Sequence, residues 1–232
     1  MRSSPFSNRR PVVPDQQVQV KICGLTERPG LAAAVNGGAR YIGLNFFPPS
    51  PRFLTLEAAA DLSAEIPPGV CKVALTVDAD DDTLDDLLAK VPVDMLQLQG
   101  SEPPARVAAV KSWYGLPVMK AVGISGPDDL AKLDTFAAVA DQLLVDAKPP
   151  SGSTLPGGNG VVFDWSLLTG RRWPVPWLLA GGLNADNVAE AIRVTGAQQV
   201  DVSSGVESAR GVKDPERVRA FLAAARDPAP AL

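Results

Sequence analysis

Two side chains that can move protons stand near the ends of apolar runs in this chain. Cys23 lies near the end of the run 18–24, and Asp146 near the end of the run 142–147. The chain has no histidine, so the commonest general acid–base side chain is absent. A catalyst built from this sequence must therefore use Cys, Asp, Glu, Lys or Tyr, and a thiol with a carboxylate can serve as a proton-transfer pair.

Strand-like and helix-like segments alternate along the chain. The strand-like runs are 18–24, 41–47, 72–77, 95–100, 117–122, 142–147, 177–181 and 198–203. The helical patterns lie at about 27–36, 56–65, 81–90, 103–113, 128–140, 164–168, 185–195 and 215–225. Eight β-then-α units predict a parallel sheet with crossover helices that closes as a (β/α)8 barrel.

A single domain fits the length of 232 residues and the 46% hydrophobic content. We expect the barrel to span 18–226, between flexible tails at 1–17 and 227–232. A doubly wound open sheet is the competing fold. It often carries a glycine fingerprint after its first strand, whereas Cys23 is followed here by Gly-Leu-Thr.

Several polar residues are predicted to point into the barrel near the carboxyl ends of its strands. Alternate residues of a strand face one side, and barrel active sites occupy this end. The residues concerned are Lys21, Cys23, Gln97, Gln99, Asp146, Asp201 and Ser203. Because buried polar groups are costly, such a cluster indicates a site or a hydrogen-bond network. Lys21, in phase with Cys23, is expected to stabilise its thiolate.

Glycines and serines follow the seventh and eighth predicted strands. A phosphate site at these two loops recurs in this fold, and glycine lets backbone N–H groups approach an anion. With a further glycine cluster at 157–160, the residues predicted to bind phosphate are Gly158, Gly181, Gly182, Ser203, Ser204 and Gly205.

Composition excludes several classes of function. The net charge of −4 and the lack of a basic stretch argue against nucleic-acid binding. The apolar runs are too short to span a bilayer, and residues 1–17 lack the apolar core of a secretory signal. Two cysteines without a CxxC motif suit a reducing cytoplasm and, with no histidine, make a zinc site improbable.

An ordered set of short motifs resembles the phosphoribosylanthranilate isomerase family of tryptophan biosynthesis. The motifs are Lys-Ile-Cys-Gly-Leu at 21–25, Gly-Leu-Asn-Phe at 43–46, Ser-Pro-Arg at 50–52, Leu-Gln-Leu-Gln-Gly at 96–100, Asp-Ala-Lys at 146–148, Gly-Gly-Asn-Gly at 157–160, Phe-Asp-Trp at 163–165, Ala-Gly-Gly-Leu at 180–183, Asp-Val-Ser-Ser-Gly-Val-Glu at 201–207 and Gly-Val-Lys-Asp at 211–214. Together they cover about 18–225.

The resemblance implies an aldose–ketose isomerase that needs no metal or cofactor. It would convert N-(5-phosphoribosyl)anthranilate to 1-(2-carboxyphenylamino)-1-deoxyribulose 5-phosphate. Carried over from the family, Cys23 is the general base and Asp146 the general acid. Arg52 would pair with the anthranilate carboxylate, and Asp201 would anchor the substrate amine or a sugar hydroxyl. The expected partner is thus a small molecule, and the protein is expected to be a monomer or a homodimer.

The assigned roles make opposite demands on the two titrating groups. An acid near pH 7 needs an aspartate pKa above its ordinary value, and a base is helped by a lowered thiol pKa. The sequence also departs from the family at two positions. Gln99 replaces a common histidine, and Asn159 stands where Thr or Ser is frequent. The carboxamide of Gln99 can form a hydrogen bond as histidine does, but it cannot carry a charge.

Three other readings remain open at this point. The related aminoaldose isomerase of histidine biosynthesis has an aspartate where Cys23 stands, so Cys23 argues against it. A metal-dependent epimerase is disfavoured by the missing histidines. A silent barrel that binds a sugar phosphate as a sensor is favoured only by Gln99.

Overall fold

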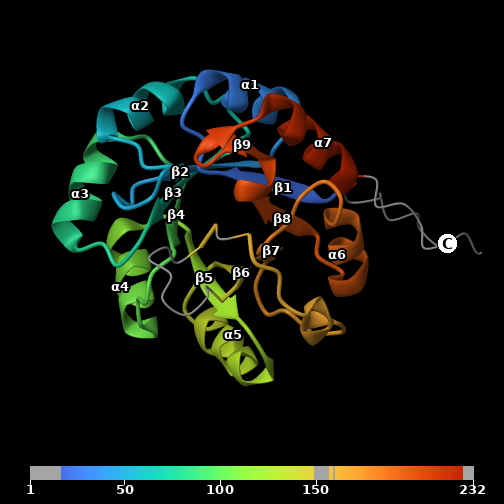
Figure 1. The fold of residues 1–232 in the computed structure, drawn as a ribbon. Coiled ribbons are helices and arrows are strands. Elements are labelled where there is room, and N and C mark those ends of the chain that lie inside the picture. Colours follow the sequence, from blue (N-terminus) through green and yellow to red (C-terminus); the bar gives the residue numbers. More distant parts are fainter. Residues whose placement is uncertain (1–16, 149–156, 159, 227–232) are drawn as a thin grey trace, which may run out of the picture.

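Eight parallel strands close into a barrel in chain order (Figure 1). The computed structural model describes residues 17–148, 157–158 and 160–226. The strands are β1 (Gln19–Cys23), β2 (Tyr41–Asn45), β3 (Cys71–Thr76), β4 (Met95–Leu98), β5 (Val118–Ile124), β6 (Gln142–Ala147), β7 (Trp177–Leu179) and β8 (Gln199–Val202). The predicted barrel is confirmed, and every predicted strand is present with its ends within two residues of the expected positions.

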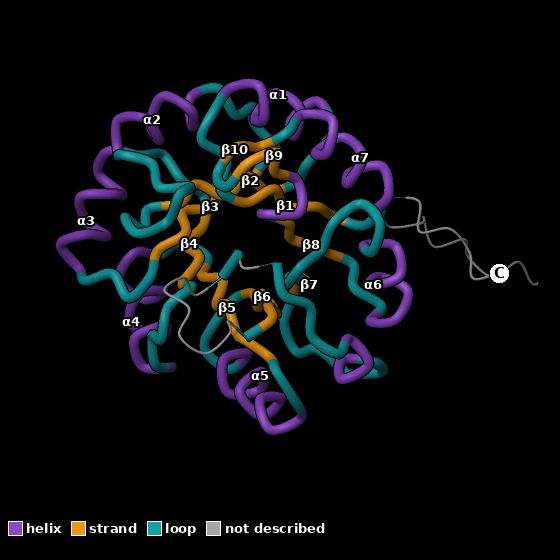
Figure 2. Tube along the Cα trace, in the orientation of Figure 1, coloured by secondary structure: helices purple, strands orange, loops and turns teal. Residues whose placement is uncertain are grey.

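The helices form a ring outside the strands, as Figure 2 shows in purple around orange. They are α1 (Arg28–Asn36), α2 (Leu56–Ala64), α3 (Asp81–Lys90), α4 (Pro104–Tyr114), α5 (Leu130–Ala137), α6 (Val188–Thr195) and α7 (Pro215–Arg226). Thr55 begins α2 by accepting a hydrogen bond from the backbone N–H of Ala58 at 3.2 Å. Gly196 ends α6 in the left-handed region, at φ 70°, where glycine carries no steric cost.

Three predicted helices differ in the structure. The segment 128–140 is divided into a 3-10 turn, η1 (Pro127–Asp129), and α5, and 164–168 is the short 3-10 helix η2 (Trp165–Leu168). The segment 185–195 becomes helical only from Val188. Each of these segments begins beside Asp, Asn, Pro or Ser, whose side chains or fixed φ favour turns over a regular helical start.

A short hairpin after β8 has no counterpart among the predicted elements. The 3-10 turn η3 (Ser204–Val206) leads into β9 (Glu207–Ala209), which pairs antiparallel with β10 (Val212–Lys213). Gly211 lies in the turn between them at φ 87°, a conformation that favours glycine. The hairpin brings Lys213 back beside Glu207, and both side chains are buried.

The barrel interior contains an apolar cluster, and polar side chains lie toward both ends of the strands. Eight buried residues form an apolar cluster inside it: Tyr41, Val73, Met95, Met119, Ala121, Leu144, Leu178 and Ala180. At the amino ends of the strands, Gln142 and Gln199 are joined by a hydrogen bond of 2.8 Å. Lys21, Gln97 and Asp201 are also buried, and their strands bring them toward the carboxyl end.

The predicted tails, 1–17 and 227–232, lie almost wholly outside the described residues. None of the helices within the described part of the chain is long and apolar enough to cross a membrane.

Candidate active site

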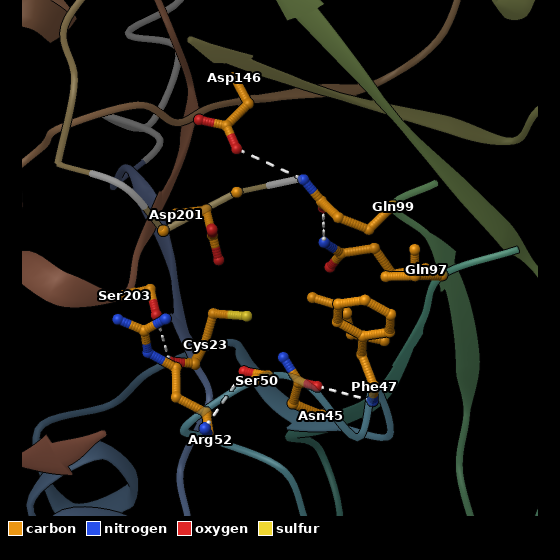
Figure 3. Close-up of a pocket in the computed structure, with 14 residues that line it drawn as sticks. Cys23, Asn45, Phe47, Ser50, Arg52, Gln97, Gln99, Asp146, Asp201 and Ser203 are labelled. Atoms are coloured by element: carbon orange, nitrogen blue, oxygen red, sulfur yellow. Dashed lines mark hydrogen bonds between the residues drawn. The ribbon is translucent and has the colours of Figure 1, made fainter. Parts of the chain in front are cut away.

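A pocket at the carboxyl ends of the strands contains both predicted proton-transfer residues (Figure 3). It is lined by Cys23, Asn45, Phe47, Ser50, Arg52, Leu75, Val77, Gln97, Gln99, Asp146, Gly157, Gly158, Asp201 and Ser203. Cys23 comes from β1 and Asp146 from β6, which are not adjacent in the barrel. Closure of the sheet therefore brings together two groups that are far apart in sequence.

A second pocket adjoins the first and is rich in glycine. Five of the six residues predicted to bind phosphate line it, namely Gly158, Gly181, Gly182, Ser203 and Ser204. Gly181 and Gly182 have φ values of 87° and 64°, in the left-handed region. Gly205 is placed differently: it packs against the backbone of Leu183, where a side chain would collide with the carbonyl oxygen. Asn159 lies outside the described residues.

Cys23 shares its surroundings with a buried ion pair. Lys21 Nζ lies 2.8 Å from Asp201 Oδ1, and the two residues are register partners on β1 and β8. Gly43 on β2 leaves space for this group, because a Cβ there would lie 2.9 Å from Cys23 Sγ and 3.0 Å from Lys21 Nζ. The ammonium and the thiol are therefore close neighbours, as the strand phase predicts.

The pKa of Cys23 moves in the direction opposite to the one expected. Burial raises the pKa of the thiol and outweighs the lowering by Lys21, while Asp201 raises it further. For Lys21, burial opposes the charge, but Asp201 and Cys23 together more than offset it, so the pKa of Lys21 is raised. Lys21 thus remains protonated beside a thiol that is a strong base when ionised.

Replacing Lys21 with methionine is expected to raise the measured pKa of Cys23 by about one unit or more, because an opposite charge is removed from its side. In a Cys71→Ala background, the pH dependence of alkylation reports Cys23 alone. Asp201→Asn serves as the opposite-sign control, because it removes a carboxylate that raises the pKa. An unchanged thiol pKa in Lys21→Met would show that the ammonium does not act on Cys23.

Asp146 is held at both carboxyl oxygens. Oδ1 accepts a hydrogen bond from the N–H of Ala147 at 2.8 Å, and Oδ2 accepts a longer one from Gln99 Nε2 at 3.4 Å. Burial, followed by the nearby carboxylate of Asp201, raises the pKa of Asp146 from 3.8 to about 7. This direction agrees with the demand on a general acid, since part of Asp146 is protonated near neutral pH.

Arg52 is already paired within the protein. Its Nε lies 2.6 Å from Glu207 Oε1, and its Nη2 lies 3.0 Å from Glu207 Oε2. Lys213 Nζ also contacts Glu207 Oε1 at 2.7 Å. Burial alone would raise the pKa of Glu207, but Arg52 and Lys213 hold it below its ordinary value. The remaining nitrogen, Nη1, is directed toward Gly158 at the pocket wall.

Sequence reasoning did not identify Glu207 and Lys213 as parts of this site. Their only signal was their place in the motifs 201–207 and 211–214, since neither follows a barrel strand directly. The pairing of Lys21 with Asp201 was also not predicted. Gln97 and Gln99 were predicted to share a face, and the structure places both in the pocket.

The closed barrel and its pockets define a class of protein: a (β/α)8-barrel enzyme in which a pocket with a thiol and a carboxyl group adjoins a glycine-rich one. Across the described ranges, no group of three or more Cys, Asp or Glu side chains is arranged to hold a metal ion.

Comparison with known proteins identifies the family. Residues 20–224 match the family model described as N-(5′-phosphoribosyl)anthranilate isomerase. The relative of that name from Paracoccus denitrificans is 62% identical over 91% of this chain and 98% of its own length. That from Cereibacter sphaeroides is 61% identical over 90% and 99%.

Solved structures agree with this assignment. The phosphoribosylanthranilate isomerase of Thermotoga maritima superposes with a TM-score of 0.81 at 34% identity, over 90% of this chain and 98% of that one. Another structure of such an isomerase, in complex with reduced 1-(o-carboxyphenylamino)-1-deoxyribulose 5-phosphate, has a TM-score of 0.78 at 33% identity and the same coverage. The chain belongs to the N-(5′-phosphoribosyl)anthranilate isomerase family and is an isomerase of tryptophan biosynthesis.

Proposed function

We propose that this isomerase converts N-(5′-phosphoribosyl)anthranilate to 1-(2-carboxyphenylamino)-1-deoxyribulose 5-phosphate, with Asp146 as general acid and Cys23 as general base. The observation that carries the proposal is that both groups line one pocket, from different strands of the barrel. The complex of a family member with a reduced product analogue supports the choice of substrate.

The reaction is an internal transfer of hydrogen with no net gain or loss of atoms. Asp146 gives its proton to the furanose oxygen, the ring opens, and the nitrogen lone pair forms a Schiff base. Cys23 then takes the proton from C2′, and the electrons of that bond move to give an enamine. Tautomerisation of the resulting enaminol, which moves a proton from the C2′ hydroxyl to C1′, gives the ketose. Exchange with solvent then returns a proton to Asp146 and removes one from Cys23, so one acid and one base suffice.

Raised pKa values for both groups are compatible with these roles. In the reactive form of the enzyme, Asp146 is protonated and Cys23 is ionised. This form is a minor fraction of the enzyme when the pKa of Cys23 is higher than that of Asp146. A thiolate with a raised pKa is, however, a stronger base in proton abstraction.

The surrounding residues suit the other parts of this substrate. We assign the phosphate to the glycine-rich pocket, where Gly181, Gly182, Ser203 and Ser204 lie. Phe47, Leu75 and Val77 give the main pocket an apolar wall for an aromatic ring. We assign the anthranilate carboxylate to Nη1 of Arg52 and a substrate amine or hydroxyl to Asp201.

Replacing Arg52 with lysine is expected to raise the KM for the substrate about 10- to 100-fold, with a smaller effect on kcat. Lysine keeps the charge but cannot bind Glu207 with one edge while directing another nitrogen to the pocket. Steady-state kinetics measure both constants. Arg28→Lys, in an exposed ion pair with Glu65, is the control and should leave KM unchanged. An unchanged KM in Arg52→Lys would remove Arg52 from the binding site.

The direct test of the proposed reaction is the loss of phosphoribosylanthranilate fluorescence on adding purified protein. The same gene should restore growth to a tryptophan auxotroph that lacks the isomerase. Well-folded protein that fails both assays would favour a sugar-phosphate sensor or a different substrate.

We also propose that the protein acts in the cytoplasm, as a monomer or a homodimer, in line with its low cysteine content. A structure of monomers generated from the dimeric isomerase of Thermotoga maritima shows that such an enzyme can form dimers. Sedimentation of the purified protein distinguishes the two states.

A further inference from the structure

We propose that Gln97 and Gln99 form a carboxamide chain in which Gln99 orients the carboxyl group of Asp146 and Gln97 contacts a hydroxyl of the bound sugar. This inference rests on the proposed function, because it assigns positioning and specificity roles for the same reaction.

The carboxamide chain runs without a break from Gln97 on β4 to Asp146 on β6 (Figure 3). Gln97 Nε2 donates to Gln99 Oε1 at 2.7 Å, and Gln99 Nε2 donates to Asp146 Oδ2 at 3.4 Å. Strand β5 lies between these strands, and its residue in register with Asp146 is Gly123. The hydrogen bond from Gln99 to Asp146 therefore reaches across β5. The longer contact is of the kind that tightens when a catalytic site is filled.

The contacts of Asp146 indicate which oxygen carries the transferable proton. Oδ1 accepts the short hydrogen bond from the N–H of Ala147, as a carbonyl oxygen does well. In the protonated acid the hydroxyl is therefore at Oδ2, the oxygen that Gln99 contacts. Gln99 thus acts on the oxygen that gives up the proton.

A carboxamide chain can support both protonation states of Asp146. With the carboxylate, each amide N–H donates toward Asp146, as described above. If both amides rotate by 180°, the Asp146 hydroxyl donates to Gln99 and the Gln99 N–H donates to Gln97. The oxygen and nitrogen of an amide occupy nearly the same positions, so the chain keeps its shape in both directions.

The Gln97 end of the carboxamide chain has an unpaired polar atom within the described residues. Gln97 is 1% exposed, and its Oε1 has no hydrogen-bond partner within the described part of the chain. An unsatisfied buried carbonyl is unfavourable, and Gln97 lines the pocket that contains Cys23. After the amides rotate, this end presents N–H instead of C=O. A hydroxyl both donates and accepts, so a sugar hydroxyl satisfies either arrangement.

Gly157 encloses the link between Gln99 and Asp146. A Cβ at this position would lie 2.8 Å from Gln99 Nε2 and 2.9 Å from Asp146 Oδ2. Because Gly157 has no side chain, its backbone can lie directly against this hydrogen bond. The Cβ of any other residue would collide with Gln99 and Asp146. The charged groups that face Asp146 from other strands are Asp201 on β8 and Lys21 on β1. Among the described residues, neither is hydrogen-bonded to Gln97 or Gln99.

The test compares Gln99→Met, Gln97→Met and the double variant. Methionine keeps the length of glutamine but has no strong donor or acceptor. We expect Gln99→Met to lower kcat about 10- to 100-fold with KM changed less than about threefold, as for a lost hydrogen bond to a charged group. We expect Gln97→Met to raise KM about 10-fold, and the double variant to lose less than the product of the single effects.

The pH profile separates positioning from a purely structural role. The Gln99 N–H stabilises the ionised form of Asp146, so its loss raises the pKa of Asp146. The acid then stays protonated to higher pH, and in Gln99→Met the pH at which kcat levels off moves upward. Gln99→His, which retains an N–H donor, should recover part of the rate and, by charging below about pH 6.5, should depress activity on the acid side.

Gln142→Met is the matched control. Gln142 is also a buried glutamine bonded to another, but at the amino end of the barrel. Its substitution should leave kcat, KM and the pH profile unchanged. The inference is overturned if Gln99→Met keeps a normal kcat and pH profile, or if Gln142→Met gives the same losses. If Gln99→Met does not fold, Gln99→Leu and Gln99→His carry the same comparison. Failure of the proposed catalytic roles would be seen separately, because Cys23→Ala and Asp146→Asn would then keep full activity.

Discussion

Asp146→Asn is expected to lower kcat by about 10²- to 10⁴-fold, which is the usual loss when a general acid is removed. Asparagine fits the same space and can still accept the hydrogen bond from the N–H of Ala147. Reversal of the carboxamide chain would accommodate its new N–H₂ group. Substrate binding should therefore persist, and steady-state kinetics should show a change mainly in kcat.

The pH dependence of this variant gives an independent check. In the wild type, kcat should rise to about pH 7, where Asp146 begins to lose the proton that it must donate, stay level while ionisation of Cys23 offsets that loss, and fall above the pKa of the thiol. The variant has no carboxyl group at this position, so this alkaline limb should vanish. Asp141→Asn, immediately before the amino end of the same strand, is the control and should keep both the rate and the limb.

The Asp146→Asn variant should be less active than the wild type but no less stable to thermal unfolding. The folded protein holds the Asp146 proton up to about pH 7, whereas the unfolded chain releases it near 3.8. Folding stability contributed by this group is therefore lost as the pH rises from about 4 to 7. At pH 8, Asp146→Asn should unfold at a temperature equal to or above that of the wild type. A clear decrease would indicate that its low activity reflects damage to the fold.

Cys23→Ala is the second variant with a large expected effect, again a loss of about 10²- to 10⁴-fold in kcat. Alanine removes the only thiol of the pocket while leaving the backbone unchanged. The ion pair between Lys21 and Asp201 should remain, so the variant should fold and bind substrate. Loss of substrate fluorescence measures the rate, and binding of a product analogue measures the affinity.

Cys71→Ala is the matched control for this experiment. Cys71 is the other free cysteine, and burial raises its pKa to about 11, so it stays a thiol at neutral pH. Its substitution should leave kcat unchanged. Near-normal turnover in Cys23→Ala would overturn the assignment of Cys23 as the base, whereas equal losses in both variants would indicate a general effect on the barrel.

The pairings inside the pocket show where sequence reasoning ends. The strand period predicted that Lys21 and Cys23 share a face, and the structure confirms it. It did not predict that Lys21 is bonded to Asp201, because that contact depends on the register between β1 and β8. Arg52 was expected to pair with the anthranilate carboxylate, and its pairing with Glu207, which Lys213 also contacts, was not predicted, because both come from the hairpin of β9 and β10.

The pKa values also show a difference between what the sequence predicts and what the structure decides. Asp146 and Cys23 were identified from residue type and position, and the sequence required a raised pKa for the acid. Burial does raise the pKa of Asp146, but it also raises that of Cys23, against expectation. Desolvation depends on how completely the other strands enclose a group, and a single segment of sequence contains no measure of this.

The sequence by itself determined the order of the eight barrel strands and most of the helices between them, the closed barrel, and the end of the barrel at which polar groups collect. These follow from local patterns, namely the period of two in strands, the turn residues and the repeated β-then-α unit. Only the tertiary structure decided which polar groups are partners: Lys21 with Asp201, Arg52 with Glu207, and Gln97 through Gln99 with Asp146. A strand's period fixes the face of a side chain, but its partner is set by strand register and barrel closure, which join residues distant in the chain.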